Sequence, residues 1–173
     1  MANKKVCLVE AGVARLGGVC LHEGCMPTKS LLKTAEIYDQ LRHAENYGIK
    51  AEVEPLSLKN AVQRKNLHLK TLNSRMRQML VQSGLHIQPG HGRFTSAQTI
   101  EVIHKGKCTL LQANNFVIAT GSRPRELEML PVDNRLVFNS TQVLNNANLP
   151  KQLLIVGGGA IGCEFASMYQ AFG

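Results

Sequence analysis

Apolar residues recur along the chain with two periods, and these periods predict where helices and strands lie. The first apolar run, residues 5–9, is short and ends in Glu10, which is typical of a buried parallel strand. The stretch 11–26 is rich in glycine and predicts a loop. The pattern thus predicts a strand that leads into a glycine-rich loop.

Two segments with a helical period follow. Pro27 can occupy a first helical position, where its missing N–H costs nothing, and this helix is expected to run to about Asn46 and stop at Gly48. Its apolar face holds Leu31, Leu32, Ala35, Tyr38 and Leu41. Ser57 is expected to cap a longer helix that ends at Gly84. Its apolar stripe, Leu58, Val62, Leu69, Leu72, Met76, Met79 and Leu80, predicts ordinary core packing.

The period then shortens to that of strands. Residues 85–88, 99–103, 108–112 and 114–120 predict strands separated by Gly, Lys and Asn turns. The last of these is apolar and ends in the turn sequence TGSRP, so it is expected to be buried. A polar connection, 125–150, follows.

The final segment combines a strand, a glycine loop and a helix. An apolar strand is predicted from Leu153, and Gly157, Gly159 and Gly162 then satisfy G-x-G-x-x-G before a helix. Such glycines let backbone N–H groups approach a pyrophosphate at a helix N-terminus. A close strand–helix crossing is the alternative interpretation. The residue that distinguishes NAD from NADP is expected about 20 positions on, beyond the 173 residues.

The positive net charge raises the question of a nucleic-acid partner, which the rest of the sequence does not favour. The formal net charge is +8, and much of it lies in 59–77 at Lys59, Arg64, Lys65, Lys70, Arg75 and Arg77. A basic balance can indicate nucleic-acid binding. Because the chain has no Trp and only 5 % aromatic residues, it lacks stacking platforms. A solvated helix face is therefore favoured, with no nucleic-acid partner.

Composition also predicts a cytoplasmic protein. Hydrophobic residues make up 44 % of the chain, which suits a globular fold. No apolar run approaches the roughly 20 residues that span a bilayer, and the N-terminal MANKKVCLVE does not resemble a signal peptide. The five cysteines have no framework spacing, and in a reducing compartment a close pair is expected to be catalytic or metal-binding rather than structural. No membrane association is expected.

Cys20 and Cys25 carry the most informative chemistry. In a regular helix five residues rise about 7.5 Å, whereas a disulfide needs Cα atoms within about 7 Å. A bend at Gly24 is therefore expected, with a helix N-terminus close to Cys25 that favours its thiolate. Three interpretations stay open at this point: a structural disulfide, a metal site with His22, or redox exchange between the two sulfurs.

The residues around the pair carry a family resemblance. LGGVCLHEGCMPTKSLL resembles the redox-active segment of the flavoprotein pyridine nucleotide–disulfide oxidoreductases. GHGRFT, VIATGSRPREL, NSTQVL and LLIVGGGAIGCEFASMYQAFG resemble further landmarks of that family, in the same order. The resemblance covers essentially the whole chain, but only the first part of a full-length family member.

The resemblance implies a role for each site residue. Cys20 would be the interchange sulfur that meets the substrate, and Cys25 would face the flavin as the charge-transfer thiolate. Lys29 would lie near the flavin and pair with Glu164. From the residues alone, Lys29 would be a surface helix lysine and Glu164 a carboxylate favoured by a helix N-terminus.

The resemblance also implies two cofactors, FAD and NAD(P), and no metal. The FAD-binding residues would be Glu10, Gly18, Lys29, Gly92, Thr120 and Gly121, and the NAD(P)-binding residues Gly157, Gly159 and Gly162. The FAD phosphate loop of the family, about 20 residues before its ribose-binding acid, and the family's C-terminal half are expected to be missing. The resemblance implies a homodimer for an intact family member and leaves the oligomeric state of these residues alone open.

The implied fold is α/β: a partial, three-layer Rossmann-like FAD domain (1–124) with a helical-hairpin excursion, a connection (125–150) and the start of a second Rossmann unit (151–173). The implied function is electron transfer between a dithiol of the dihydrolipoyl kind and NAD(P) through Cys20 and Cys25. These residues alone are expected to be inactive. The alternatives are a non-catalytic nucleotide-binding protein, or a family member that acts on mercuric ion or glutathione disulfide.

Overall fold

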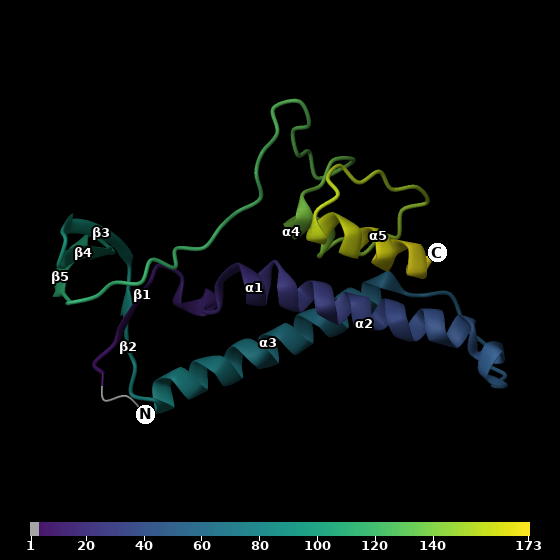
Figure 1. Ribbon diagram of the computed structural model, residues 1–173, viewed down its shortest axis with the longest axis horizontal. Coiled ribbons are helices and arrows are strands. Elements are labelled where there is room, and N and C mark those ends of the chain that lie inside the picture. The colour runs from purple at the N-terminus through teal and green to yellow at the C-terminus, as the bar shows by residue number, and fades with distance from the viewer. Residues whose placement is uncertain (1–3) are drawn as a thin grey trace. The chain divides into compact units, whose positions relative to one another are not determined.

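The computed structural model describes residues 4–173, and these form two compact units that are described separately. The first unit contains Gly18 and the described residues before it, together with Thr71–Gly121. The second contains Val19–Lys70 and Ser122–Gly173. Elements carry the labels of Figure 1.

The first unit holds all the strands of the described chain. Its parallel pair joins β1 (Cys7–Glu10) to β2 (His86–Pro89). Its antiparallel sheet has the order β3 (His91–Ser96), β4 (Thr99–His104) and β5 (Lys107–Gln112). Together with the helices this is a mixed α/β fold, which confirms the predicted class. Figure 1 shows the three-stranded sheet beside the β1–β2 pair.

Four of the predicted strands are confirmed within two residues, and one strand was not predicted. β3 escaped prediction because all six of its residues are exposed, so its sequence shows no alternation of apolar and polar positions. The chain enters β3 through Gly90, whose φ is 137°. A Cβ atom there would lie 2.7 Å from the backbone oxygen of Ile103 and from a methyl carbon of Val102, so only glycine fits this passage.

Two predicted strands are wrong. Residues 114–120 and 153–156 adopt no strand, and they expose large apolar side chains: Val117 is 91 % exposed and Leu154 is 88 % exposed. A strand exists only where a neighbouring strand accepts and donates its ladder hydrogen bonds. The described residues supply no such neighbour to either run, although both have the apolar character of a buried strand.

The helices gather mainly in the second unit, and α3 runs through both. Short 3-10 turns lie at Val13–Arg15 and Ala44–Tyr47. The α-helices are α1 (Gly18–His22), α2 (Cys25–Arg42), α3 (Leu58–Gln82), α4 (Ser140–Val143) and α5 (Ala160–Phe172). The predicted helical hairpin is thus α2 followed by α3. The connection 125–150, expected to be only polar, contains α4, which a capping box between Asn139 and Gln142 begins.

The structure corrects the start of α2. The glycine-rich stretch 11–26 is not a plain loop, because it contains α1, and α2 begins at Cys25 rather than at Pro27. The Thr28 N–H and hydroxyl both donate to the Gly24 carbonyl, at 3.2 and 2.7 Å, which closes the first turn two residues earlier than predicted. Pro27 is then the third helical residue, where an N–H would still lack an intrahelical partner.

The remaining helix ends agree with the sequence. Ser57 caps α3 by accepting the Asn60 N–H at 3.3 Å. Gly48 and Gly84 adopt positive φ, 75° and 74°, just past the ends of their helical segments. The first helical segment changes to a 3-10 turn after Arg42 before it stops at Gly48.

The core of the second unit lies where α2, α3 and α5 meet. It is formed by Leu31, Ala35, Leu58, Ala61, Val62, Leu144, Phe165, Met168 and Phe172. Lys65 corrects the prediction of a solvated basic face on α3, because it is only 1 % exposed. Its spacing of three and four residues from Val62 and Ala61 places it on the buried stripe.

Candidate functional site

The two cysteines of the pair lie on consecutive helices separated by a sharp bend. Cys20 is in α1, and Cys25 is the first residue of α2. Between them, Gly24 closely approaches the preceding helix: a Cβ atom there would lie 3.1 Å from the Val19 carbonyl oxygen. Both cysteines are exposed free thiols. The bend expected at Gly24 is thus present, and it joins two helices.

The environment of Cys20 couples it to Cys25. A hydrogen bond with the Cys25 side chain is the main cause that raises the pKa of the Cys20 thiol, and burial and the charge of Cys25 add to it. The backbone N–H groups of Cys25 and Met26 act in the opposite direction and lower this pKa. The positive end of α2, expected beside Cys25, therefore also acts on Cys20. Two thiols in mutual contact at a helix N-terminus can close a disulfide or exchange one.

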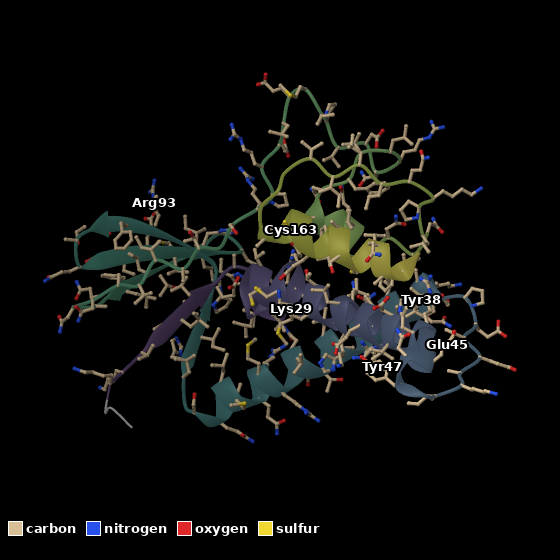
Figure 2. The ribbon with its side chains drawn as sticks, turned by 45° about the vertical axis from the view of Figure 1, so that its right-hand side comes forward. Lys29, Tyr38, Glu45, Tyr47, Arg93 and Cys163 are labelled. Carbon is tan, nitrogen blue, oxygen red and sulfur yellow. The ribbon has the colours of Figure 1, made fainter. Side chains whose placement is uncertain are left out.

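An ion pair lies one turn further along α2. The Lys29 ammonium donates to a carboxylate oxygen of Glu164 on α5. The side chains are 58 % and 31 % exposed, respectively. Figure 2 shows Lys29 on α2 and Cys163, the residue before Glu164, near the start of α5. The structure thus brings together two site residues that are 135 positions apart in the sequence.

The glycine loop before α5 has the shape of an anion cradle. Gly157 has a φ of 115°, and Gly159 is the N-cap of α5. A Cβ atom on Gly162 would lie 2.1 Å from the Gly157 carbonyl oxygen, so the helix can approach the loop only with glycine there. Nothing lies within 4 Å of a Cβ built on Gly157, Gly158 or Gly159, so this side is open to a ligand. The residues present fit a dinucleotide pyrophosphate.

The other predicted nucleotide residues belong to the first unit. Glu10 ends β1, and one oxygen of its carboxylate accepts the Gly12 N–H at 2.8 Å. A carboxylate at the end of a parallel strand is a suitable acceptor for ribose hydroxyls, so Glu10 fits the adenosine ribose of FAD. Gly92 lies on β3, where a Cβ atom would make an ordinary 3.5 Å contact with Val9.

Gly18, Thr120 and Gly121 also belong to the first unit. Gly18 opens α1 with a φ of 58°. Thr120 and Gly121 do not end a strand, contrary to the prediction, because 114–120 is unpaired. Lys29, the remaining predicted FAD residue, belongs to the second unit.

Two basic residues on α3 form contacts that the sequence did not predict. Lys65 is buried and donates to the Leu144 carbonyl at 2.6 Å and to the Asn145 side-chain oxygen at 3.0 Å. Burial lowers the pKa of Lys65 to about 8. Arg64 donates to the Ser30 carbonyl at 2.9 Å. The available signal was spacing, because Lys65 continues the apolar stripe of α3.

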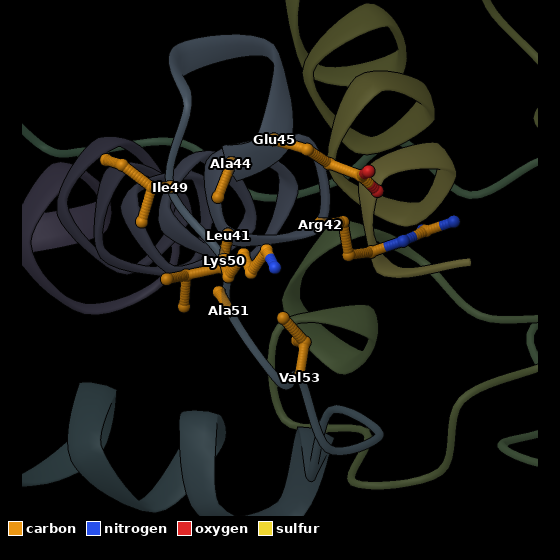
Figure 3. Close-up of a pocket in the computed structure, with 8 residues that line it drawn as sticks. All are labelled: Leu41, Arg42, Ala44, Glu45, Ile49, Lys50, Ala51 and Val53. Carbon is orange, nitrogen blue, oxygen red and sulfur yellow. The ribbon is translucent and has the colours of Figure 1, made fainter.

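Other features lie away from these residues. A hollow of about 470 Å³ at the end of α2 is lined by Leu41, Arg42, Ala44, Glu45, Ile49, Lys50, Ala51 and Val53, none of them a predicted site residue (Figure 3). Across residues 4–173, no group of three or more His, Cys, Asp or Glu side chains is arranged to hold a metal ion. None of the helices described is both long enough and apolar enough to cross a membrane.

A pair of cysteines on consecutive helices, a neighbouring ion pair and a glycine loop at a helix N-terminus are features typical of oxidoreductases that bind a dinucleotide. Over residues 1–173 the sequence matches the family described as pyridine nucleotide-disulphide oxidoreductase, and the chain belongs to this family. The family comprises FAD- and NAD(P)-dependent oxidoreductases.

Individual relatives agree with this assignment. The chain is 37 % identical over 172 residues to dihydrolipoyl dehydrogenase of Zymomonas mobilis, and 37 % identical over 171 residues to that of Geobacillus stearothermophilus. Each match covers 99 % of this chain and 36 % of the relative, so the chain spans about a third of the length of these proteins.

Solved structures show the same fold. LpdA from Mycobacterium tuberculosis superposes with a TM-score of 0.85 at 21 % identity, over 98 % of this chain and 37 % of that one. The HOCl-induced flavoprotein disulfide reductase RclA from Escherichia coli gives 0.77 at 29 % identity, over 99 % and 35 % of the two chains. The α/β fold class predicted from the resemblance is therefore confirmed.

Proposed function

We propose that this chain carries the dithiol–disulfide centre of an FAD-dependent oxidoreductase that moves two electrons between a dithiol and NAD(P). The contact between the Cys20 and Cys25 thiols at the start of α2 is the observation that supports this proposal. Similarity to dihydrolipoyl dehydrogenases favours a dihydrolipoyl group as the dithiol. The domain boundaries at 124 and 150 stay predictions.

The proposed exchange begins with the Cys20–Cys25 disulfide. A substrate thiolate attacks the Cys20 sulfur, the bond between the two cysteines breaks, and Cys25 leaves as a thiolate. The second substrate thiol then attacks the substrate sulfur of the mixed disulfide and releases Cys20. The substrate has lost two electrons and two protons, and the cysteine pair has gained the two electrons. Bound FAD would accept this electron pair and deliver it to a nicotinamide.

The other site residues are proposed to hold the cofactors and the charge. Glu10 would accept ribose hydroxyls of FAD, with Gly18, Gly92, Thr120 and Gly121 allowing its close approach. Gly157, Gly159 and Gly162 would hold the NAD(P) pyrophosphate at the start of α5. Lys29, oriented by Glu164, would keep a positive charge next to the centre that receives electrons.

The reaction is proposed for a protein that includes more than these 173 residues, which correspond to 36 % of the length of the relatives. The chain on its own is expected to show no ordinary rate of lipoamide reduction by NADH. A measurable steady-state rate with the purified chain would contradict this expectation.

The first experiment is an absorption spectrum of the chain with FAD, before and after addition of a dithiol. A long-wavelength charge-transfer band is expected in the native chain and in Cys108→Ser, because Cys108 is an exposed cysteine outside the pair. Cys25→Ser is expected to lose the band and keep FAD. FAD binding without any response to the dithiol in the native chain would instead favour a nucleotide-binding protein without thiol turnover.

A further inference from the structure

Adjacent cations on α3 contact two different parts of the second unit. Arg64 donates from Nη2 to the Ser30 carbonyl at 2.9 Å and to the Thr34 hydroxyl at 3.1 Å, both on α2. Lys65 donates from Nζ to Leu144 and Asn145, just past the end of α4. Consecutive helical residues point in directions about 100° apart, so one step of α3 is enough to reach both partners.

The Lys65 contact joins α3 to the end of α4 from a buried position. Its side chain is 1 % exposed, and the partners it has are two neutral oxygens. Burying an ammonium costs solvation free energy. Hydrogen bonds to neutral acceptors offset only part of that cost when no carboxylate is paired with the ammonium. In return, Lys65 satisfies the Leu144 carbonyl, which follows the last turn of α4 and has no further helix to bond it.

Each of these contacts is connected to one member of the Lys29–Glu164 ion pair, one through the sequence and one through the core. Ser30, whose carbonyl Arg64 holds, directly follows Lys29 on α2. Leu144, whose carbonyl Lys65 holds, belongs to the same buried core as Phe165, which directly follows Glu164 on α5. The backbone next to each member of the ion pair is therefore tied, directly or through the core, to one turn of α3.

The ion pair is too weak to hold α2 and α5 in place by itself. The Lys29 side chain is 58 % exposed and the Glu164 side chain 31 % exposed. Ion pairs that reach solvent in this way stabilise a structure by about 1 kcal/mol or less. Its geometry must come from the elements that carry it, α2 and α5, and from what fixes them.

We propose that Arg64 and Lys65 are positioning residues that hold α2 and α5 in register, so that Lys29 and Glu164 meet. The importance of that meeting for electron transfer rests on the proposed function, whereas the positioning itself does not. Neither Arg64 nor Lys65 is placed in contact with substrate or cofactor.

Zero-length cross-linking measures the contact directly. A water-soluble carbodiimide activates the Glu164 carboxylate, the neutral Lys29 amine attacks it, an amide forms and the urea leaves with one carboxylate oxygen. Mass spectrometry of the digested chain quantifies the Lys29–Glu164 product. The Lys33–Glu36 pair, 3.0 Å apart within α2, provides an internal reference because it does not depend on α3.

The measured quantity is the ratio of the Lys29–Glu164 product to the Lys33–Glu36 product. In Lys65→Met and in Arg64→Met this ratio is expected to fall about fivefold, a change within the range for residues that share one packed network. Arg64→Lys, which can keep one hydrogen bond to Ser30, is expected to recover part of it. Lys59→Met, an exposed lysine of the same helix, is the matched control and is expected to leave the ratio unchanged.

The alternative outcomes are separable. If folded Lys65→Met and Arg64→Met keep the native ratio, the positioning proposal is overturned. If Lys65→Met loses its helical circular dichroism, Asn145→Ala decides instead, because it removes one acceptor of Lys65 and leaves the lysine in place; an unchanged ratio there and in Arg64→Met overturns the proposal. None of these results depends on flavin or dithiol. The positioning proposal can therefore fail while the absorption test supports the proposed function, and the reverse is also possible.

Discussion

The buried Lys65 predicts an unusual dependence of stability on pH. Burial lowers its pKa from 10.5 to about 8 in the folded chain. Below about pH 8 the lysine is charged in both states, and the folded state carries the full cost of the buried charge. Between pH 8 and 10.5 the folded chain has lost this proton and the unfolded chain still binds it. Stability must therefore rise with pH across this window.

The magnitude follows from the difference between the two pKa values. A difference of one corresponds to 1.36 kcal/mol, so the penalty at neutral pH is about 3 kcal/mol, and most of it is relieved by pH 10. The neutral amine still has two protons to donate to the Leu144 carbonyl and to Asn145, so its hydrogen bonds survive deprotonation. Deprotonation of Lys65 therefore removes the cost of the buried charge and keeps the two hydrogen bonds.

The assay compares the native chain with Lys65→Met by urea unfolding, monitored by circular dichroism, from pH 7 to 10. Met fills a similar volume and does not titrate, but it leaves two acceptors without a donor, at a cost of about 1–3 kcal/mol each that does not depend on pH. The native chain is therefore expected to gain about 2–3 kcal/mol relative to the variant between pH 7 and 10. All other ionisable groups are common to the two chains and cancel in the difference.

Lys59→Met is the matched control, since Lys59 is exposed on the same helix and its replacement should give no such slope. A difference between the native chain and Lys65→Met that stays constant from pH 7 to 10 would refute the reasoning. It would mean that Lys65 keeps its ordinary pKa and that its ammonium is hydrated in solution.

Three further substitutions test the site. Cys25→Ala removes the main cause that raises the pKa of the Cys20 thiol, so the midpoint of Cys20 alkylation against pH should fall, and an unchanged midpoint would show that the thiols do not interact. Gly162→Ala places a Cβ atom 2.1 Å from the Gly157 carbonyl oxygen, so NADH binding measured by fluorescence should be lost, whereas retained affinity would show that the loop is not the site. Gly90→Ala meets a backbone oxygen at 2.7 Å with φ at 137°, and should lower the free energy of unfolding by about 2 kcal/mol or more; a chain of native stability would contradict this strand passage.

The sequence predicted the long helices α2, α3 and α5 more reliably than the strands, for a physical reason. A helix bonds to itself, so a cap such as Ser57 and a stop such as Gly84 are enough to locate it. A strand needs a neighbouring strand for its hydrogen bonds, and the local sequence pattern does not identify that neighbour. Residues 114–120 and 153–156 are as apolar as buried strands, yet they are unpaired in the described chain, and β3 is paired without being apolar.

The candidate site shows a similar division. The Cys20–Cys25 pair and the loop at Gly157–Gly162 are local, so their spacing was enough to single them out, although the redox interpretation of the cysteines came from the family resemblance. The partnership of Lys29 with Glu164 spans 135 positions, and it followed only from the family resemblance. No spacing rule connects two residues that meet because separate helices share a core.

A count of basic residues did not reveal that Lys65 is buried in the core between helices. Counted among the basic residues of 59–77, it adds one charge to a helix face that looked solvated. Its position three residues after Val62 places it on the buried stripe instead, where an ammonium is stable only if oxygens from another segment reach it. Leu144 and Asn145 provide those oxygens, and they can do so only if 140–145 packs beside α3. The lysine therefore selects one packing of this segment over others, because any arrangement that moves Leu144 and Asn145 away leaves a buried charge without a partner.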